Sequence, residues 1–483
     1  MTSTYDTVIR NASVVDGTGA PRFDADIALD GGRIARIGDL GGARGREEID
    51  GRGLTATPGF IDSHTHDDRE LLSRGDMTPK VSQGVTTVIG GNCGVSLAPM
   101  RHTPGTAPIP PLDLLDGTGE WCRYQRFSEY LQALTEQPAA TNCAMLVGHT
   151  NLRVLEMDDL YRPAEPAEIV RMRARVAEAL EAGAIGVSTG LAYAPAAAAT
   201  TQEVIEVCRP LTGVQGLYCT HMRDEGDTVV DSLEETFRIG RELGVPVVIS
   251  HHKLVGKANH GRSIETLEII RQRMAYQPVC LDCYPYNASS TVLTQTLVHN
   301  ASRTLVTWSR ALPQFAGQDL EDVARDLGCS VSEAVDRLQP AGAVYFRMDD
   351  ADVQRILQFD DTMIGSDGLP HDERPHPRLW GTFPRVLGLH CRELALFSLE
   401  TAVHKMTGLT AAKFGLADRG VLREGAPADL VLLDARSVID RATFAQPTNV
   451  SEGIHCVWTN GVPVWRDGRA TGHRPGQVLR RTP

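Results

Sequence analysis

The fold is decided by the stretch Thr57-Pro58-Gly59-Phe60-Ile61-Asp62-Ser63-His64-Thr65-His66, an apolar, strand-like run that ends in two histidines. Residues two apart on a strand point to the same side, so His64 and His66 can bind one ion. Seven similar runs follow, separated by helical stretches such as 163–182 and 232–243. The eight expected strands are Thr57–His64, Val85–Gly90, Ala144–His149, Ala184–Thr189, Gly216–His221, Val247–His251, Val279–Tyr284 and Thr362–Asp367.

This alternation of strands and helices is typical of βα units around a parallel sheet. Eight such units predict an α/β fold, a (β/α)8 TIM barrel, over residues 58–417. A doubly wound open sheet is the alternative, but the first run is not followed by a Gly-x-Gly-x-x-Gly pattern. The gap between the last two runs is too long for a plain loop, so we expect an inserted small subdomain at 287–342 over the barrel mouth.

Both ends of the chain contain short strand-like segments. Residues 1–57 contain three such pieces broken by Gly, Asp and Asn, and residues 418–483 contain similar runs. Asn460-Gly461 between two of the later runs is a strong hairpin signal. We therefore expect one small β-sandwich domain built from both termini.

Composition excludes several functional classes. The chain has 483 residues and a formal net charge of −13, and it contains no cluster of Lys and Arg, so we expect no nucleic-acid partner. No uncharged apolar run is long enough to span a membrane, and the N-terminus lacks the features of a secretion signal. We expect a cytoplasmic protein whose ten cysteines are thiols or metal ligands; Cys280 and Cys283 should face opposite sides of a strand, in the core. The oligomeric state stays open.

Residues that can ligate a metal follow five of the expected strands. Besides the two histidines of the first strand, Cys93, His221, His251 and Asp367 stand at strand ends. The carboxyl ends of all barrel strands meet on one face, where such folds carry their chemistry. Each residue alone has an ordinary structural explanation, such as a turn cap for Asp367, but five coincidences are improbable. Imidazole, thiolate and carboxylate together suit zinc.

Several longer motifs are similar to those of the D-aminoacylases, the N-acyl-D-amino-acid deacylases of the amidohydrolase superfamily. The stretch 57–66 and a β domain from both termini are features of the whole superfamily. The narrower resemblance is carried by Gly91-Asn92-Cys93-Gly94, Thr220-His221-Met222-Arg223-Asp224-Glu225-Gly226, Ser250-His251-His252-Lys253 and Gly365-Ser366-Asp367-Gly368-Leu369-Pro370, and by the segment 368–380. The resemblance covers nearly the whole chain.

The resemblance implies one tight zinc on Cys93, His221 and His251, and a weaker second metal position near His64, His66 and Asp367. Many superfamily members bridge two metals with a modified lysine after strand 4, but that end reads Gly186-Val187-Ser188-Thr189-Gly190 here. The resemblance implies that a thiolate from Cys93 takes the place of this lysine, as a thiolate does in the D-aminoacylases. The implied reaction is hydrolysis of an amide by an activated water, with Asp367 as general base and then general acid.

The substrate, a small N-acyl-D-amino acid, needs a cation for its carboxylate. Arg378 is our candidate, because a guanidinium binds a carboxylate through two parallel hydrogen bonds. Lys253 and Tyr284 are its partners by resemblance. His252, His371 and His376 receive no role. The apolar content of the expected insertion (Val292, Leu293, Leu297, Val298) hints at a hydrophobic D-amino acid, although these residues can equally pack the subdomain.

Three rival hypotheses remain. A cyclic-amide hydrolase of the hydantoinase or dihydroorotase kind would share the barrel and the paired histidines, but it would carry the bridging lysine. A deaminase of the same superfamily would leave Cys93 unexplained. A catalytically dead scaffold would usually have lost ligands, whereas every ligand-type position is filled here.

Overall fold

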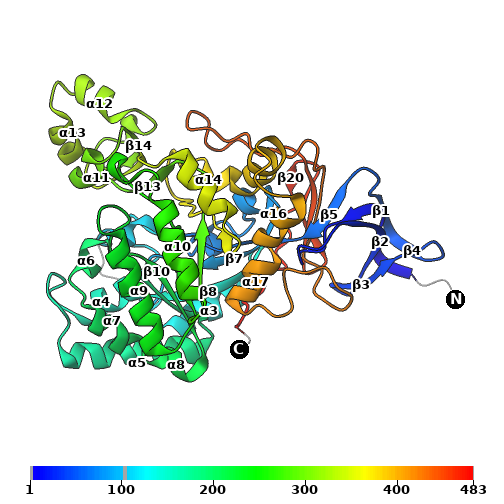
Figure 1. The fold of residues 1–483 in the computed structure, drawn as a ribbon, viewed down its shortest axis with the longest axis horizontal. Coiled ribbons are helices and arrows are strands. Elements are labelled where there is room, and N and C mark those ends of the chain that lie inside the picture. The colour runs from blue at the N-terminus through cyan, green and yellow to red at the C-terminus, as the bar shows by residue number, and fades with distance from the viewer. Residues whose placement is uncertain (1–3, 102–105, 482–483) are drawn as a thin grey trace.

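The computed structural model describes residues 4–101 and 106–481. Its hydrogen-bonded strands form an eight-stranded sheet, a nine-stranded sheet and a three-stranded sheet. The eight-stranded sheet is the centre of the molecule, with the nine-stranded sheet on one side and the three-stranded sheet at the opposite end (Figure 1).

The eight-stranded sheet is the expected parallel barrel. Neighbouring strands pair in chain order, and the seam between the last and the first strand is bridged by hydrogen bonds from Ser63 N to Ile364 O (3.2 Å) and from Asp367 N to His64 O (2.7 Å). The (β/α)8 prediction is therefore confirmed. The strands are β6 (Phe60–Asp62), β7 (Val85–Gly90), β8 (Asn142–Gly148), β9 (Gly186–Gly190), β10 (Leu217–His221), β11 (Val247–Ile249), β12 (Val279–Cys283) and β16 (Thr362–Ile364).

Helices surround the barrel on the outside. In α9 (Val229–Leu243) the buried residues Val229, Leu233 and Phe237 recur every four positions, and the helix ends at Gly244, whose φ of 66° closes the last turn. The other helices of the barrel are α1 (Glu70–Ser73), α2 (Thr78–Val81), α3 (Phe127–Glu136), α4 (His149–Glu156), α5 (Pro166–Ala182), α6 (Ala194–Ala197), α7 (Thr201–Cys208), α8 (Pro210–Val214), α10 (Ser263–Met274), α14 (Asp350–Gln358), α15 (Arg378–Arg385), α16 (Leu399–Met406) and α17 (Gly408–Phe414).

The first predicted strand, Thr57–His64, is in fact two strands. Thr57 and Pro58 end β5 (Thr55–Pro58) of the nine-stranded sheet, and β6 begins at Phe60. The chain changes sheets at Gly59, where a Cβ atom would lie 2.1 Å from the Thr86 hydroxyl oxygen. Only glycine allows this close approach, so the apolar run continues through a boundary that its pattern does not show.

The nine-stranded sheet combines both ends of the chain, as expected. Asn460 and Gly461, with φ of 49° and 79°, turn the hairpin between β18 and β19, as the Asn-Gly signal predicted. The strands are β1 (Thr4–Val14), β2 (Phe23–Asp30), β3 (Arg33–Gly38), β4 (Arg44–Asp50), β5, β17 (Leu430–Leu433), β18 (Ile454–Thr459), β19 (Val462–Arg466) and β20 (Arg469–Ala470).

The three-stranded sheet belongs to the insertion between β12 and β16. It contains β13 (Ala288–Val292), β14 (Arg303–Ser309) and β15 (Ala341–Phe346), with helices α11 (Gln295–His299), α12 (Leu320–Asp326) and α13 (Val331–Leu338). The boundaries that we expect for the three parts of the chain, with the insertion at 287–342, stay a prediction.

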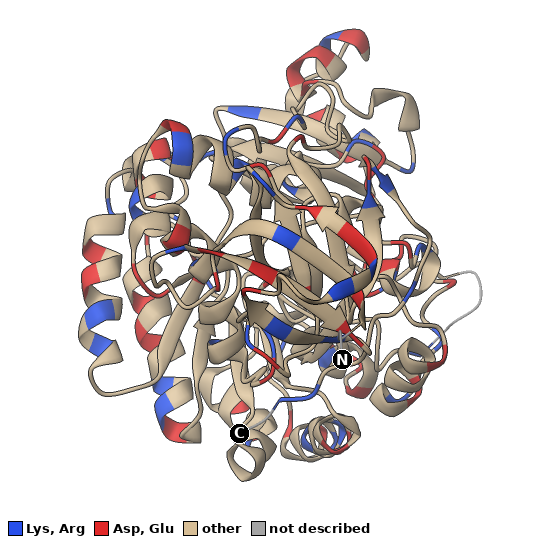
Figure 2. Ribbon diagram, turned by 90° about the vertical axis from the view of Figure 1, so that its right-hand side faces the viewer, with Lys and Arg blue, Asp and Glu red and all other residues tan. Residues whose placement is uncertain are grey.

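The interior of the barrel is apolar below the strand ends. Ile61, Leu146, Leu217 and Cys280 lie in one buried cluster inside it, while Cys283 packs in the cluster around it, so the two cysteines face opposite sides of β12. Lys and Arg are interspersed with Asp and Glu along the ribbon (Figure 2). Among the described residues, no helix combines the length and the apolar character needed to cross a membrane.

Candidate metal centre and active site

Six side chains that can ligate a metal converge at the carboxyl ends of the barrel strands. They form two groups that share Cys93, and the ligand atoms within each group lie within 4.8 Å of one another. The Cys93 sulfur lies 3.2 Å from His64 Nε2 and 3.3 Å from His251 Nε2. His251 Nε2 is also 3.1 Å from His221 Nδ1. The second group is His64, His66, Cys93 and Asp367, and the first is Cys93, His221 and His251.

Three of these residues have a left-handed backbone. The φ values of Cys93, His251 and Asp367 are 54°, 37° and 49°. Such values are uncommon for residues other than glycine and carry strain that the surrounding structure has to hold. Each of the three lies two or three residues after the last residue of its strand.

Burial and neighbouring charges set the ionisation of the cluster. Burial lowers the pKa of His64 to about 3, so its imidazole is neutral and free to act as a ligand. Burial, and then the charge of Asp367, raise the pKa of the Cys93 thiol well above its usual value. Burial would also raise the pKa of Asp367, but the charge of Arg378 and a hydrogen bond with His66 hold it well below its usual range. A buried thiol among imidazoles and an ionised carboxylate is a donor set that fits a soft divalent cation.

A second carboxylate supports the first histidine. Asp282, on β12, accepts a hydrogen bond from His251 N (2.8 Å), and its Oδ1 lies 3.4 Å from His64 Nδ1. A carboxylate behind an imidazole fixes the orientation of the ring and makes it a better metal ligand. Asp282 was missed in the sequence, because it looked like one polar residue inside an apolar strand.

A buried lysine ties the first and last strands together beneath the cluster. Lys80 Nζ donates to Asp62 (2.7 Å), to Thr65 Oγ1 (2.9 Å) and to Ser366 Oγ (2.8 Å), and lies 3.2 Å from Asp67. Burial alone would lower the pKa of Lys80, but the two carboxylates raise it. The lysine therefore stays charged and holds the seam that carries His64 and Asp367.

Lys253 contacts the protein instead of facing an open space. Its Nζ donates to Glu225 Oε1 (2.6 Å) and to the carbonyl of His251 (2.9 Å), and lies 2.6 Å from His251 Nδ1. These contacts position the imidazole of His251, so the expected role of Lys253 in binding the substrate carboxylate stays a prediction. Glu225 itself had no assigned role in the sequence, although it lies in the motif that contains His221.

Arg378 lies at the centre with Tyr284. Its Nη1 lies 2.9 Å from Asp367 Oδ2, its Nη2 donates to the carbonyl of Ser290 (3.1 Å), and its guanidinium carbon lies 4.5 Å from the centre of the Tyr284 ring. Arg378 Nε and the hydroxyls of Tyr284 and Ser290 are buried without a hydrogen-bond partner among the described residues. Buried donors that lack partners cost free energy unless a ligand satisfies them. Serine is too common for the sequence to have singled out Ser290.

A cavity of about 430 Å³ leads to the cluster. Its lining includes the ligand candidate His221, Glu225 and Tyr193. The Tyr193 ring lies 5.0 Å from the His221 ring, and its hydroxyl is 3.2 Å from Thr291 Oγ1 of the insertion. Of the residues behind the hydrophobic hint, Val292 and Leu297 line this cavity, whereas Leu293 and Val298 pack inside the insertion.

Two of the three histidines without a role have a polar partner outside the ligand groups. His252 Nε2 lies 2.9 Å from Thr266 Oγ1, and His376 Nε2 lies 3.0 Å from the carbonyl of Ala288. His371 lies 3.9 Å from Glu70, outside the ligand groups.

The comparisons with known proteins agree with this geometry. The sequence profile of the Amidohydrolase family matches residues 47–272 and 314–465, and the chain belongs to this family. D-aminoacylase from Alcaligenes xylosoxydans xylosoxydans is 58% identical over 99% of this chain and 98% of its own length. A solved D-aminoacylase with a binuclear metal centre, in which one metal activates and the second attenuates, is 57% identical, with a TM-score of 0.96 over 99% of this chain and 100% of the other.

A more distant relative was solved with a ligand. N-acyl-D-glutamate deacylase from Bordetella bronchiseptica, in complex with zinc and a phosphonate that mimics the tetrahedral intermediate, is 46% identical. Its TM-score is 0.94 over 99% of this chain and 100% of the other. Together these similarities confirm the resemblance to the D-aminoacylases that the motifs predicted.

Proposed function

We propose that this protein hydrolyses the amide bond of N-acyl-D-amino acids and releases a carboxylate and a free D-amino acid. The observation that supports this function best is the pair of ligand groups that share the single thiol of Cys93, next to an ionised Asp367 and a buried Arg378. The bridging lysine of a cyclic-amide hydrolase has no counterpart at the end of β9, which reads Gly186–Gly190. The solved D-aminoacylase and N-acyl-D-glutamate deacylase support the same reaction class.

We propose zinc as the metal. Cys93, His221 and His251 would hold the tight ion, and His64, His66 and Asp367 would hold the weaker second one, with Cys93 also within reach. Zinc bound there would supply Lewis acidity, which lowers the pKa of a water and polarises the acyl carbonyl.

Asp367 is the general base of this proposal. Arg378 and a hydrogen bond with His66 hold its pKa well below the usual range against the effect of burial, so it is ionised at neutral pH, as a general base has to be. It takes the proton of the attacking water and then delivers it to the nitrogen of the departing amine. One carboxylate can serve as base and then as acid, because the proton that it accepts in the first step is the proton that it donates in the second.

Arg378 and Tyr284 would bind the carboxylate of the substrate. Ser290, which the sequence did not single out, would be a third contact. These three residues present the unsatisfied donors Nε, Oη and Oγ, all buried. An incoming carboxylate would satisfy them with charge-assisted hydrogen bonds. Lys253 would contribute by orienting His251, and through its positive charge.

The test is a chiral assay of amine release from racemic N-acetylmethionine, N-acetylglutamate and N-acetylaspartate, with hydantoin as the cyclic control. The purified protein is assayed as prepared, after chelation, and after zinc is added back. We expect release of the D-enantiomer alone, lost on chelation and restored by zinc. Release of the L-enantiomer, or turnover of hydantoin in preference to the linear amides, would refute the proposal.

A further inference from the structure

We propose that Arg347 recognises a second carboxylate, so that the preferred substrates are N-acyl-D-amino acids with an acidic side chain. This inference rests on the proposed function and specifies its substrate class. It departs from the hydrophobic side chain at which the sequence hinted.

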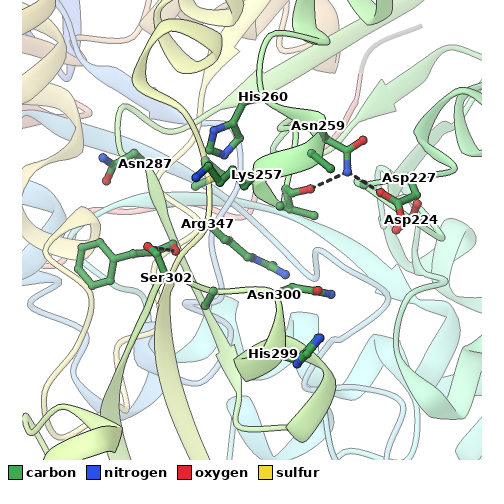
Figure 3. Close-up of a pocket in the computed structure, with 17 residues that line it drawn as sticks. Asp224, Asp227, Lys257, Asn259, His260, Asn287, His299, Asn300, Ser302 and Arg347 are labelled. Carbon is green, nitrogen blue, oxygen red and sulfur yellow. Dashed lines mark hydrogen bonds between the residues drawn. The ribbon is translucent and has the colours of Figure 1, made fainter.

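Arg347 lies where two cavities meet. One is the cavity of about 430 Å³ that reaches His221 at the metal centre, and the other, of about 740 Å³, lies between the barrel loops and the insertion. Both are lined by Arg347, together with Asp224 and Val255. Figure 3 shows the Arg347 side chain in the larger cavity, reaching between Lys257 and Asn300. Arg347 and His221 of the metal centre therefore line the same inner cavity.

The guanidinium of Arg347 is oriented but not neutralised. Its Nε donates to Ser289 Oγ (2.9 Å), and its guanidinium carbon lies 5.7 Å from the centre of the Tyr345 ring. Among the described residues its two terminal nitrogens have no hydrogen bond and no ion pair. A half-buried, planar, unpaired fork of donors is the arrangement that binds a carboxylate through two parallel hydrogen bonds.

Of the other three charged residues that line the inner cavity, two are in ion pairs and the third, Asp224, is held by hydrogen bonds. Arg223 binds Glu235 through Nε (2.9 Å), and Glu225 accepts from Lys253. Asp224 accepts two hydrogen bonds from Thr228, one of them from the backbone. Arg347 is thus the cation that remains available to an anion in this cavity, as far as the described residues extend.

The strand β13 anchors both this cation and the proposed carboxylate site. Ser289 holds Arg347 through its hydroxyl, and the next residue, Ser290, holds Arg378 through its carbonyl. The charge of Arg347 also reaches Tyr284, where it opposes the rise in the pKa of that phenol that burial causes. Two guanidiniums anchored on consecutive residues of one strand can each receive one carboxylate of a substrate that carries two. Val255, Val292 and Leu297 offer apolar contacts to the methylene groups between them.

The experiment compares kcat/KM of the zinc-loaded full-length protein for N-acetyl-D-glutamate, N-acetyl-D-aspartate and N-acetyl-D-methionine. The variants are Arg347→Gln, which removes the charge, and Arg347→Lys, which keeps it. Arg337→Gln is the matched control, because Arg337 is an exposed arginine of the insertion on α13. Zinc content and circular dichroism establish that each variant is folded and loaded.

We expect the wild type to prefer an acidic substrate over N-acetyl-D-methionine by at least about 10-fold. Arg347→Gln should lower kcat/KM for that acidic substrate by about 10- to 100-fold, the range for the loss of a charged hydrogen bond, and change the methionine value by less than about 3-fold. Arg347→Lys should retain part of the preference, and Arg337→Gln all of it.

Three outcomes would overturn the inference. If the wild type prefers N-acetyl-D-methionine and Arg347→Gln leaves all values unchanged, the pocket is not built for an acid and the proposed function survives alone. If Arg347→Gln lowers all three values equally, Arg347 acts on the common part of the substrate. If the zinc-loaded wild type hydrolyses none of the three, the proposed function fails and the inference fails with it.

Discussion

Replacement of the buried Lys80 by methionine should destabilise the barrel seam. Lys80 is fully buried, and its amine lies within 3.2 Å of both Asp62 and Asp67. Methionine has a similar length but cannot donate a hydrogen bond, so Lys80→Met leaves two buried carboxylates without their counterion. Breaking a buried ion pair on one side typically costs about 3–5 kcal/mol.

The expected change in Tm follows from the size of the chain. An unfolding entropy of about 2.1 cal/mol/K per residue, over 483 residues, makes 1 kcal/mol equivalent to about 1 °C. Lys80→Met should therefore lower the Tm of the metal-free protein by about 3–5 °C in differential scanning calorimetry. Lys413→Met is the control, because Lys413 pairs with Asp361 at 2.6 Å where both side chains are about 30% exposed. Such a pair contributes about 0–1 kcal/mol.

The seam also carries two of the candidate ligands, so the same substitution has a second readout. Asp62 accepts hydrogen bonds from Ser366, the neighbour of Asp367. We expect Lys80→Met to weaken zinc binding, measured by competition with a chromophoric chelator, while Lys413→Met leaves it unchanged. A Tm within 1 °C of the wild type would refute the reasoning, because the two carboxylates would then have to be neutral or solvated in the native state.

Three further substitutions test other parts of the centre. Asp367→Asn should retain zinc at the tight site, measured by elemental analysis, and lower kcat by about 10²- to 10⁴-fold, because it removes the general base; a near-normal kcat would exclude that role. Arg378→Leu should raise KM by about 10- to 100-fold for a substrate with a free carboxylate but not for its methyl ester; equal effects on both would exclude the clamp. Glu70→Gln tests a pH dependence outside the ligand groups: burial, and then Asp67, raise the pKa of Glu70 from 4.5 to about 8. Between these pH values the folded state keeps a proton that the unfolded state releases, so wild-type stability falls as the pH rises, by about 3–5 kcal/mol in total. The Tm of Glu70→Gln relative to the wild type should therefore rise by about 3–5 °C from pH 5 to pH 8, and a constant difference would show that Glu70 is ionised throughout.

The sequence was sufficient for the fold because the periodic signals are local. Each barrel strand is an apolar run bounded by polar residues, and its position in the chain places it in the sheet. The boundary at Gly59 was missed because it depends on a contact with Thr86, a residue of the neighbouring strand. The hairpin at Asn460 was found because both of its left-handed residues are adjacent in the sequence.

The site could be predicted in its ligand types but not in its contacts. His64, Cys93 and Asp367 were found because they follow strand ends, a property that can be read along the chain. Lys80 and Ser290 were missed because one lies on a short helix and the other on the insertion, and each reaches the centre only through the tertiary fold. The three-dimensional arrangement also shows which partner each charge has. Arg378 was expected to bind the substrate carboxylate, and its contact with Asp367 could not be read from the sequence.

The pairing of charges around the centre has a consequence for substrate binding. Asp367 lies against Arg378, and Glu225 lies against Lys253, so each of these two carboxylates already has a cation beside it. A substrate carboxylate therefore competes with Asp367 for the guanidinium of Arg378. A cation near His64 and His66 would neutralise Asp367 in its place and leave Arg378 more available, because the attraction between two charges weakens when a third balances one of them. Metal binding at the proposed second position and substrate binding at the proposed carboxylate site thus both depend on the carboxylate of Asp367. The same carboxylate is the proposed proton acceptor.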